Sequence, residues 1–197
     1  MNHLYEILAR LIEYPADDWN TPVERWEQRL TTEGDEVPPQ LVELRRKLRD
    51  LPIESLQELY TRTFDLNPVC TLDIGYHLFG ENYKRGELLA GLRETEAPFE
   101  LGQQNQLPDY LPVLLRLLVK LEDQELRESL IVELLIPALS KMLQSLDDAN
   151  NPYRYLIQAI DTELRNDASE VQTDLSKRDA TAVPELYRIS SRTAARP

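Results

Sequence analysis

Cys70, the only cysteine of the chain, lies seven positions before His77, one of its two histidines. A thiol beside an imidazole could form the nucleophile and base of a hydrolase. In a helix, however, residues seven apart share one face but are separated by about 10 Å along the axis, which is too far for a hydrogen bond. We therefore predict no catalytic pair here and interpret Cys70 as a small buried side chain.

The spacings that hold metal ions and nucleotides do not occur either. The chain has no His-x-x-x-His, no Cys-x-x-Cys and no Glu-x-x-His, which are the patterns of zinc and di-iron sites. Gly80, Gly86 and Gly91 do not form a Gly-x-Gly-x-x-Gly or phosphate-loop pattern. The residues by themselves thus predict no metal, no cofactor and no enzyme.

The chain is strongly acidic: 35 Asp and Glu residues outnumber 22 Lys and Arg residues, giving a formal net charge of −13. Binding to nucleic acid needs clustered cations, and an anionic membrane surface would repel this chain. A partner with basic segments would be attracted. With one cysteine, no run of 18 apolar residues and no basic leader, the sequence predicts a cytoplasmic protein without stable membrane insertion.

Apolar residues recur at helical spacing along most of the chain, and no segment alternates as a strand would. The pattern is clear at residues 4–12, where Pro15 ends it, and at 113–118, which is apolar nearly all round and is the predicted core helix. Pro137 lies inside a further helical pattern and predicts a kink or break. The other helices are predicted over residues 22–30, 39–48, 52–66, 71–79, 82–93, 124–146 and 152–164.

The sequence therefore predicts an all-α fold, a single compact bundle of about eight to ten helices over residues 1–165. Within it, residues 94–105 are predicted to be irregular. From residue 166 onward large apolar side chains become rare, and five acidic residues balance five basic ones. The net negative charge thus belongs to the helical part, and residues 166–197 are predicted to form a flexible C-terminal tail.

Two segments combine aromatic and polar residues in a way that packing alone explains poorly. Residues 60–86 are dense in aromatic side chains and include Asp65, Asp73 and Arg85. Residues 107–112 read Leu-Pro-Asp-Tyr-Leu-Pro. In a groove that receives a peptide, aromatic rings supply contact area and a few polar groups fix the orientation. The alternative is that the aromatic residues form a core face beside turns.

At these residues the sequence resembles the NarJ family, the delta-subunit assembly chaperones of respiratory nitrate reductase. This family belongs to the wider TorD/DmsD-like group of maturation chaperones for molybdenum enzymes. The resemblance spans residues 4–165, and the chain departs from the family pattern at Gln106 and in the 92–105 connector. The matching elements are Tyr60, Phe64-Asp65, Cys70, Leu72, His77-Leu78-Phe79-Gly80-Glu81, Arg85-Gly86, Leu107-Pro108-Asp109-Tyr110-Leu111-Pro112 and the opening helix that ends at Tyr14-Pro15.

The resemblance implies a TorD/NarJ-like fold and a chaperone rather than an enzyme. Members of the family bind the N-terminal segment of the apo catalytic subunit of nitrate reductase. They hold it until molybdenum cofactor and an iron–sulfur cluster are inserted, before the enzyme docks at the membrane. Partners from molybdenum cofactor biosynthesis are implied as well. By carry-over, the predicted peptide-binding residues are Tyr60, Phe64, Asp65, Tyr76, His77, Phe79, Arg85, Asp109 and Tyr110.

Several alternatives stay open at this point. The client could be another molybdenum oxidoreductase, of the dimethyl sulfoxide or selenate reductase type, and the chain could be a helical enzyme or a scaffold without a groove. Asp109 could instead cap the helix that follows it, and His77 could be a satisfied histidine near a helix end. The chain is expected to be a monomer or a weak homodimer, and its tail could fold back onto the acidic body.

Overall fold

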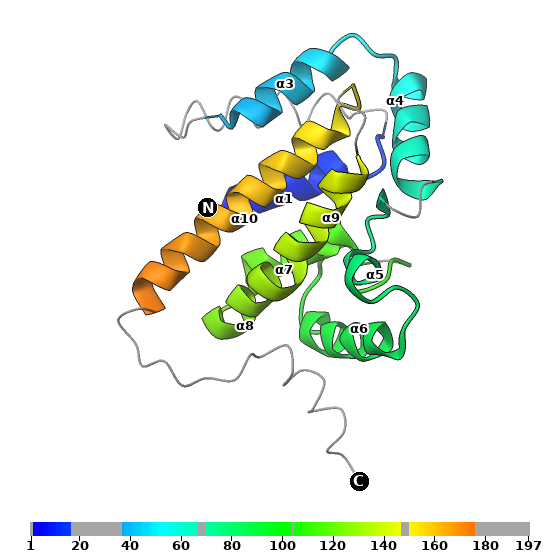
Figure 1. Cartoon of the computed structure of the whole chain (residues 1–197). Helices are drawn as coiled ribbons and strands as arrows, with labels where there is room; N and C mark the ends of the chain where they lie inside the picture. Colours follow the sequence, from blue (N-terminus) through cyan, green and yellow to red (C-terminus); the bar gives the residue numbers. More distant parts are fainter. Residues whose placement is uncertain (1, 17–36, 67–69, 104, 147–149, 176–197) are drawn as a thin grey trace.

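The computed structural model describes residues 2–16, 37–66, 70–103, 105–146 and 150–175. Within these ranges every regular element is helical (Figure 1), so the all-α prediction is confirmed. The predicted helix at 22–30 lies outside the described residues. The α-helices are α1 (Asn2–Ile12), α3 (Pro39–Leu48), α4 (Ile53–Tyr60), α5 (Ile74–Phe79), α6 (Tyr83–Glu96), α7 (Leu111–Lys120), α8 (Gln124–Ser129), α9 (Ile136–Ser145) and α10 (Tyr153–Leu175).

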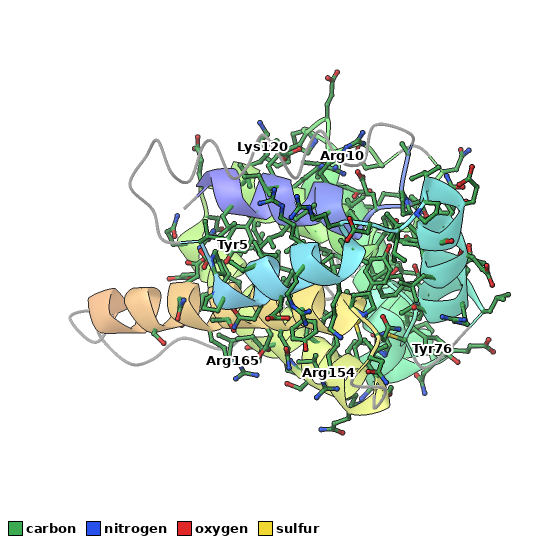
Figure 2. The ribbon with its side chains drawn as sticks, turned by 90° about the horizontal axis from the view of Figure 1, so that it is seen from above. Tyr5, Arg10, Tyr76, Lys120, Arg154 and Arg165 are labelled. Carbon is green, nitrogen blue, oxygen red and sulfur yellow. The ribbon has the colours of Figure 1, made fainter. Side chains whose placement is uncertain are left out.

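Helix α7 forms the centre of the core, as its apolar sequence predicts. Seven of its ten residues are buried, because a helix that is apolar nearly all round can avoid water only between other elements. Helix α1 packs along α7, and α10 packs against α1, α3 and α9. Figure 2 shows the side chains that fill the space between these helices, with Tyr5 among them. Helices α4, α5 and α6 lie along one edge of the molecule (Figure 1).

Two π-helical turns interrupt the helical segments, η1 (Thr61–Asp65) after α4 and η3 (Leu130–Leu135) before α9. The second turn directly precedes Pro137, which lies in the first turn of α9. Proline lacks an N–H and clashes with the carbonyl four residues before it, so a wider turn relieves both problems. The predicted interruption at Pro137 is confirmed, and it takes the form of this π-helical turn.

Helix α10 continues to Leu175, past the predicted boundary between bundle and tail at residue 165. Two residues past that boundary lies a buried ion pair: Arg127 Nη1 donates to Asp167 Oδ1 over 2.7 Å, and the Tyr5 hydroxyl donates to Asp167 Oδ2 over 2.7 Å. Asp167 is only 4% exposed. Helix α10 therefore runs ten residues beyond the expected end of the bundle, and residues 176–197 lie outside the described part.

Among the described residues, no helix has both the length and the apolar character needed to cross a bilayer.

Helix α6 runs three residues further than predicted, to Glu96. The irregular connector therefore begins at Ala97 and leads through Leu101, which is buried, to the segment before α7. This connector places residues 107–112 beside α5.

Candidate functional site

Two segments that the sequence singled out lie side by side. The backbone N–H of Leu111 donates to the carbonyl of Leu72 over 2.9 Å, and that of Ile74 donates to the carbonyl of Asp109 over 2.8 Å. These bonds form an isolated antiparallel bridge between Asp73 and Tyr110. The predicted helix at 71–79 is therefore wrong at its start: α5 begins only at Ile74, because its preceding residues are extended in the bridge.

The Asp109 carboxylate is buried beneath this bridge and has no exposed surface. Its Oδ2 accepts from the backbone N–H of Gly75 over 3.1 Å, in the first turn of α5, and from Nε of Arg85 over 2.9 Å. The interpretation of Asp109 as the cap of the following helix is wrong, because Tyr110 is the N-cap residue of α7. Asp109 instead satisfies an N–H of α5, 34 residues earlier in the chain.

The Arg85 guanidinium joins three parts of the site. Besides its bond through Nε, its Nη2 donates to Asp109 Oδ1 over 3.2 Å and to Asp73 Oδ2 over 3.1 Å. Its central carbon lies 5.7 Å from the centre of the Tyr76 ring, within range of a cation–π contact. Burial, with help from the neighbouring Asp109 charge, raises the pKa of Asp73 against the opposing influence of Arg85.

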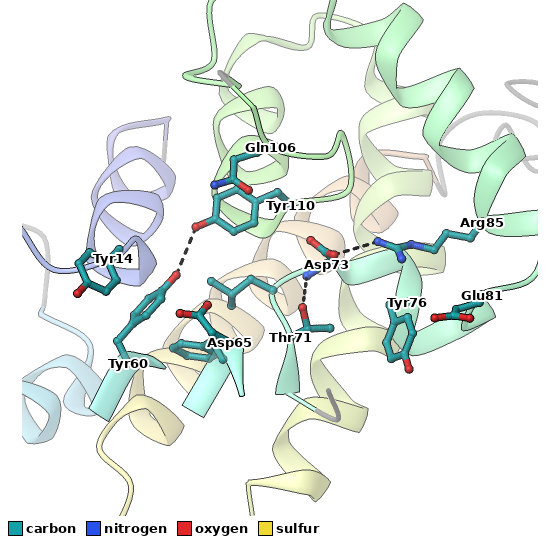
Figure 3. A pocket seen from close by; sticks show the side chains of 12 residues that line it. Tyr14, Tyr60, Asp65, Thr71, Asp73, Tyr76, Glu81, Arg85, Gln106 and Tyr110 are labelled. Atoms are coloured by element: carbon teal, nitrogen blue, oxygen red, sulfur yellow. Dashed lines mark hydrogen bonds and ion pairs between the residues drawn. The ribbon is translucent and has the colours of Figure 1, made fainter. Parts of the chain in front are cut away.

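A pocket of about 670 Å³ opens beside these residues. Figure 3 shows its aromatic and charged side chains converging from α4, η1, α5, α6 and the segment before α7. Such a volume suits a few side chains of a ligand. The lining residues are Tyr14, Tyr60, Phe64, Asp65, Thr71, Leu72, Asp73, Tyr76, Glu81, Arg85, Gln106 and Tyr110.

One part of the pocket is aromatic. The Tyr60 ring makes edge-to-face contacts with Tyr14 at 5.3 Å and with Phe64 at 5.0 Å between centroids. Its hydroxyl lies 3.4 Å from the Tyr110 hydroxyl. Burial raises the pKa of Tyr60, so its hydroxyl stays protonated at neutral pH. The π-helical turn η1 follows Tyr60 directly, and both Phe64 and Asp65 from this turn line the pocket.

The other part of the pocket is acidic. Asp65, Asp73 and Glu81 line it, and Arg85, which already pairs with two carboxylates, is the one cation in the described part of the lining. Asp65 and Glu81 are exposed, and their carboxylates make no hydrogen bond or ion pair with other described residues. The lining thus carries excess negative charge beside aromatic rings, an arrangement that attracts a basic ligand with apolar side chains.

Six of the nine predicted binding residues line this pocket, and three do not. His77 donates from Nε2 to the carbonyl of Thr71 over 2.7 Å, and its own carbonyl accepts from Lys141 Nζ over 2.7 Å. Phe79 packs against the core, and Asp109 lies behind the lining. The six that line the pocket are Tyr60, Phe64, Asp65, Tyr76, Arg85 and Tyr110.

Six further lining residues were not among the predicted ones. Tyr14 follows the end of α1, Gln106 precedes the Leu-Pro-Asp-Tyr-Leu-Pro segment, and Asp73 lies in the aromatic-rich segment. The sequence analysis had thus already singled out the segments that contain or adjoin these three residues. No local signal marks them as lining, because they meet only through the bridge between two distant segments. These residues are Tyr14, Thr71, Leu72, Asp73, Glu81 and Gln106.

The described residues contain no group of three or more His, Cys, Asp and Glu side chains suited to hold a metal ion. Cys70 is fully buried, and burial raises the pKa of its thiol to about 12. A thiol with that pKa stays protonated at neutral pH and is a poor nucleophile. The Nε2 atom of His77 is also engaged, because it donates its hydrogen bond to the carbonyl of Thr71.

Fold and pocket together define an all-helical protein with an acidic, aromatic-walled pocket. Residues 27–159 match the family model described as "Nitrate reductase delta subunit", and the chain belongs to this family, the NarJ family. A relative from Bacillus subtilis (strain 168) is named "Probable nitrate reductase molybdenum cofactor assembly chaperone NarJ". It is 24% identical over 164 residues, which cover 82% of this chain and 88% of the relative. The predicted family membership is confirmed.

Proposed function

We propose that this chain is an assembly chaperone of nitrate reductase whose pocket binds the N-terminal segment of the apo catalytic subunit. It holds that subunit until molybdenum cofactor and an iron–sulfur cluster have been inserted, and then dissociates. The family and the printed name of the Bacillus subtilis relative support the assembly role. The observation that carries the peptide-binding part is the pocket of about 670 Å³, with aromatic and acidic walls.

Exposed apolar side chains occur in and near the lining segments. Tyr14, which lines the pocket, is 52% exposed. Leu66 and Tyr83 are 74% and 79% exposed, and each lies within two positions of a lining residue in the chain. Exposed large apolar side chains are candidates for contact with a partner. A client segment with one apolar face and basic residues would match the aromatic and acidic lining.

Proposed direct contacts to the client are the predicted lining residues other than Arg85, together with Asp73 and Glu81. They are Tyr60, Phe64, Asp65, Asp73, Tyr76, Glu81 and Tyr110. The carboxylates would face basic residues of the client, and the rings would receive its apolar side chains. Such an interface is charged at its exposed edge, so its affinity depends on ionic strength. The role needs no catalytic group in the chain.

Calorimetric titration of a synthetic peptide with the N-terminal sequence of the catalytic subunit tests this function. A scrambled peptide of the same composition is the matched control, because it keeps the charge but not the order of apolar residues. We expect saturable binding of the native peptide at micromolar or better affinity and much weaker binding of the scrambled one. Absence of heat with both peptides at low salt would refute the proposal. Equal binding of peptides from dimethyl sulfoxide or selenate reductases would assign a different or broader client.

A further inference from the structure

We propose that Asp109 and Arg85 are positioning residues: they set the wall of the pocket and its charge, and Asp109 does not touch the client. This inference rests on the proposed function, because it concerns how the same pocket binds a peptide. It departs from the prediction that Asp109 lines the groove.

Asp109 is inaccessible to a ligand in this arrangement. It has no exposed surface, it is absent from the pocket lining, and its two oxygens accept three hydrogen bonds, two from Arg85 and one from Gly75. A client cation could reach this carboxylate only by displacing the guanidinium. Charge-assisted bonds of this kind are strong, and breaking one side leaves a buried charge unpaired.

Arg85 connects the buried Asp109 to the residues that line the pocket. Its side chain is 15% exposed, and it lines the pocket together with the two groups that it contacts, Asp73 and Tyr76. Asp109 also fixes the start of α5 through the N–H of Gly75. One buried carboxylate therefore determines where two pocket residues from α5 and its preceding turn lie, without contacting the ligand itself.

Gly75 shows how closely this arrangement is packed. A Cβ atom at this position would lie 2.8 Å from Asp109 Oδ2 and 2.9 Å from Leu88 Cδ2. Both distances are shorter than any ordinary contact. A side chain at position 75 would thus force the Asp109 carboxylate, the Leu88 side chain or the start of α5 to shift, although Gly75 does not itself line the pocket.

The pair also sets the charge of the pocket. Arg85 is the only cation among the described residues that line the pocket, and it pairs with two carboxylates. Removing the Asp109 charge would leave Arg85 half-paired and available to repel a basic client. Removing both charges would restore the net charge of the site. A direct contact between Asp109 and the client predicts a different result, since loss of Arg85 could not then replace the lost carboxylate.

A double-mutant cycle with the native client peptide separates these two accounts. We expect Asp109→Asn to weaken binding about tenfold, within the coupling typical of residues in one ion-pair network. The double variant Asp109→Asn/Arg85→Gln should recover to within about threefold of the wild type. If the double variant binds as weakly as the product of the single effects predicts, Asp109 contacts the client and the inference is wrong.

Asp65→Asn is the matched control, because it removes the same charge from the pocket at a carboxylate without a partner among the described residues. Its loss of affinity should be independent of Arg85→Gln. If Asp65→Asn were coupled to Arg85→Gln as strongly as Asp109→Asn is, the coupling would not be specific to the pair of Asp109 and Arg85, and the inference would be wrong.

Gly75→Ala is the alternative test variant if Asp109→Asn does not fold. A folded Gly75→Ala chain should bind the peptide more weakly, and unchanged affinity would overturn the inference. Failure of the wild-type chain to bind would instead refute the proposed function.

Discussion

The hydroxyl oxygens of Tyr60 and Tyr110 lie 3.4 Å apart, although 50 residues separate them in the chain. Tyr60 ends α4, and Tyr110 is the N-cap residue of α7. Their contact joins the aromatic-rich segment to the segment before the core helix. Tyr153, at the start of α10, packs behind Tyr60 with 5.9 Å between the ring centroids. The aromatic wall of the pocket is therefore continuous with the core.

This continuity predicts different outcomes for two substitutions at Tyr60. Tyr60→Phe keeps the ring contacts and loses one long hydrogen bond, so we expect a loss of about 1 kcal/mol or less in the free energy of unfolding. Tyr60→Ala removes the ring and should cost about 3–5 kcal/mol. Urea denaturation measures both. Tyr83→Ala is the control, because this ring is 79% exposed and should change the value by about 0.5 kcal/mol at most. A comparable cost at Tyr83 would contradict this interpretation.

Gly80 and Gly86, which lie on either side of the turn between α5 and α6, should respond to alanine in opposite directions. Gly80 ends α5 with φ +59° and ψ −141°, a conformation in which a side chain is strained by about 1–3 kcal/mol. Gly86 lies within α6, and a Cβ there meets nothing within 4 Å. Gly86→Ala should therefore stabilise the chain by about 0.5–1 kcal/mol. Thermal unfolding of both variants checks this, and stabilisation by Gly80→Ala would show that the turn is not as described.

The ion pair of Arg127 with Asp167 should make the end of α10 essential for stability. Asp167→Asn leaves the buried guanidinium without its charge partner and should lower the free energy of unfolding by about 3–5 kcal/mol. Although burial opposes ionisation, hydrogen bonds from Arg127 and Tyr5 hold the pKa of Asp167 below its usual value. Its contribution is therefore present at neutral pH and is lost as the pH falls through that lowered pKa.

Two shortened chains test the same point without a side-chain substitution. A chain ending at residue 165 lacks Asp167, whereas one ending at Leu175 retains it. The shorter chain should be less stable by at least the cost of Asp167→Asn, as measured by urea denaturation. Equal stability of the two chains would mean that the predicted boundary at 165 was adequate after all.

Stability should also depend on His77 in mildly acidic solution. Burial is the largest influence and lowers the pKa of His77 below its usual value of 6.5, and the nearby Lys141 ammonium acts in the same direction. The folded chain therefore binds fewer protons than the unfolded chain. Its free energy of unfolding should decrease as the pH falls below about 6.5, until the lowered pKa is passed.

His77→Gln should remove most of this pH dependence, whereas His3→Gln, at the other histidine of the chain, should retain it. The measurement is urea denaturation at a series of pH values between neutrality and about pH 5, the range in which an ordinary histidine titrates. The same slope in the wild type and in His77→Gln would show that His77 is not the group responsible.

The sequence was sufficient for most of the fold, because helical periodicity and prolines act locally. Residues 113–118 predicted the core helix α7, and Pro137 predicted an interruption that the structure places in η3. It was not sufficient where a distant residue decides the local structure. Helix α5 starts at Ile74 and not at the predicted residue 71, because the carbonyl of Leu72 accepts a hydrogen bond from Leu111. The sequence near residue 71 contains no pattern that predicts this distant partner.

The candidate site was predictable in position and less so in detail. Aromatic and charged residues in 60–86 and the Leu-Pro-Asp-Tyr-Leu-Pro segment indicated two walls, and the structure brings them together. The side-chain directions were not predictable. Asp109 is buried behind the lining, where Arg85 and Gly75 hold it, and Asp73 enters the lining because of the bridge with Tyr110. A buried carboxylate and an exposed one look alike in the sequence.

The measurement that tests the central claim most directly is the salt dependence of client-peptide affinity in the wild type and in Asp65→Asn/Glu81→Gln. This variant removes two pocket carboxylates that have no partner among the described residues, so the fold should be retained. We predict that wild-type affinity falls as salt is raised. At low salt the variant should bind more weakly than the wild type and should depend less on salt. Identical affinity and salt dependence in both chains would contradict the claim that this pocket binds the client.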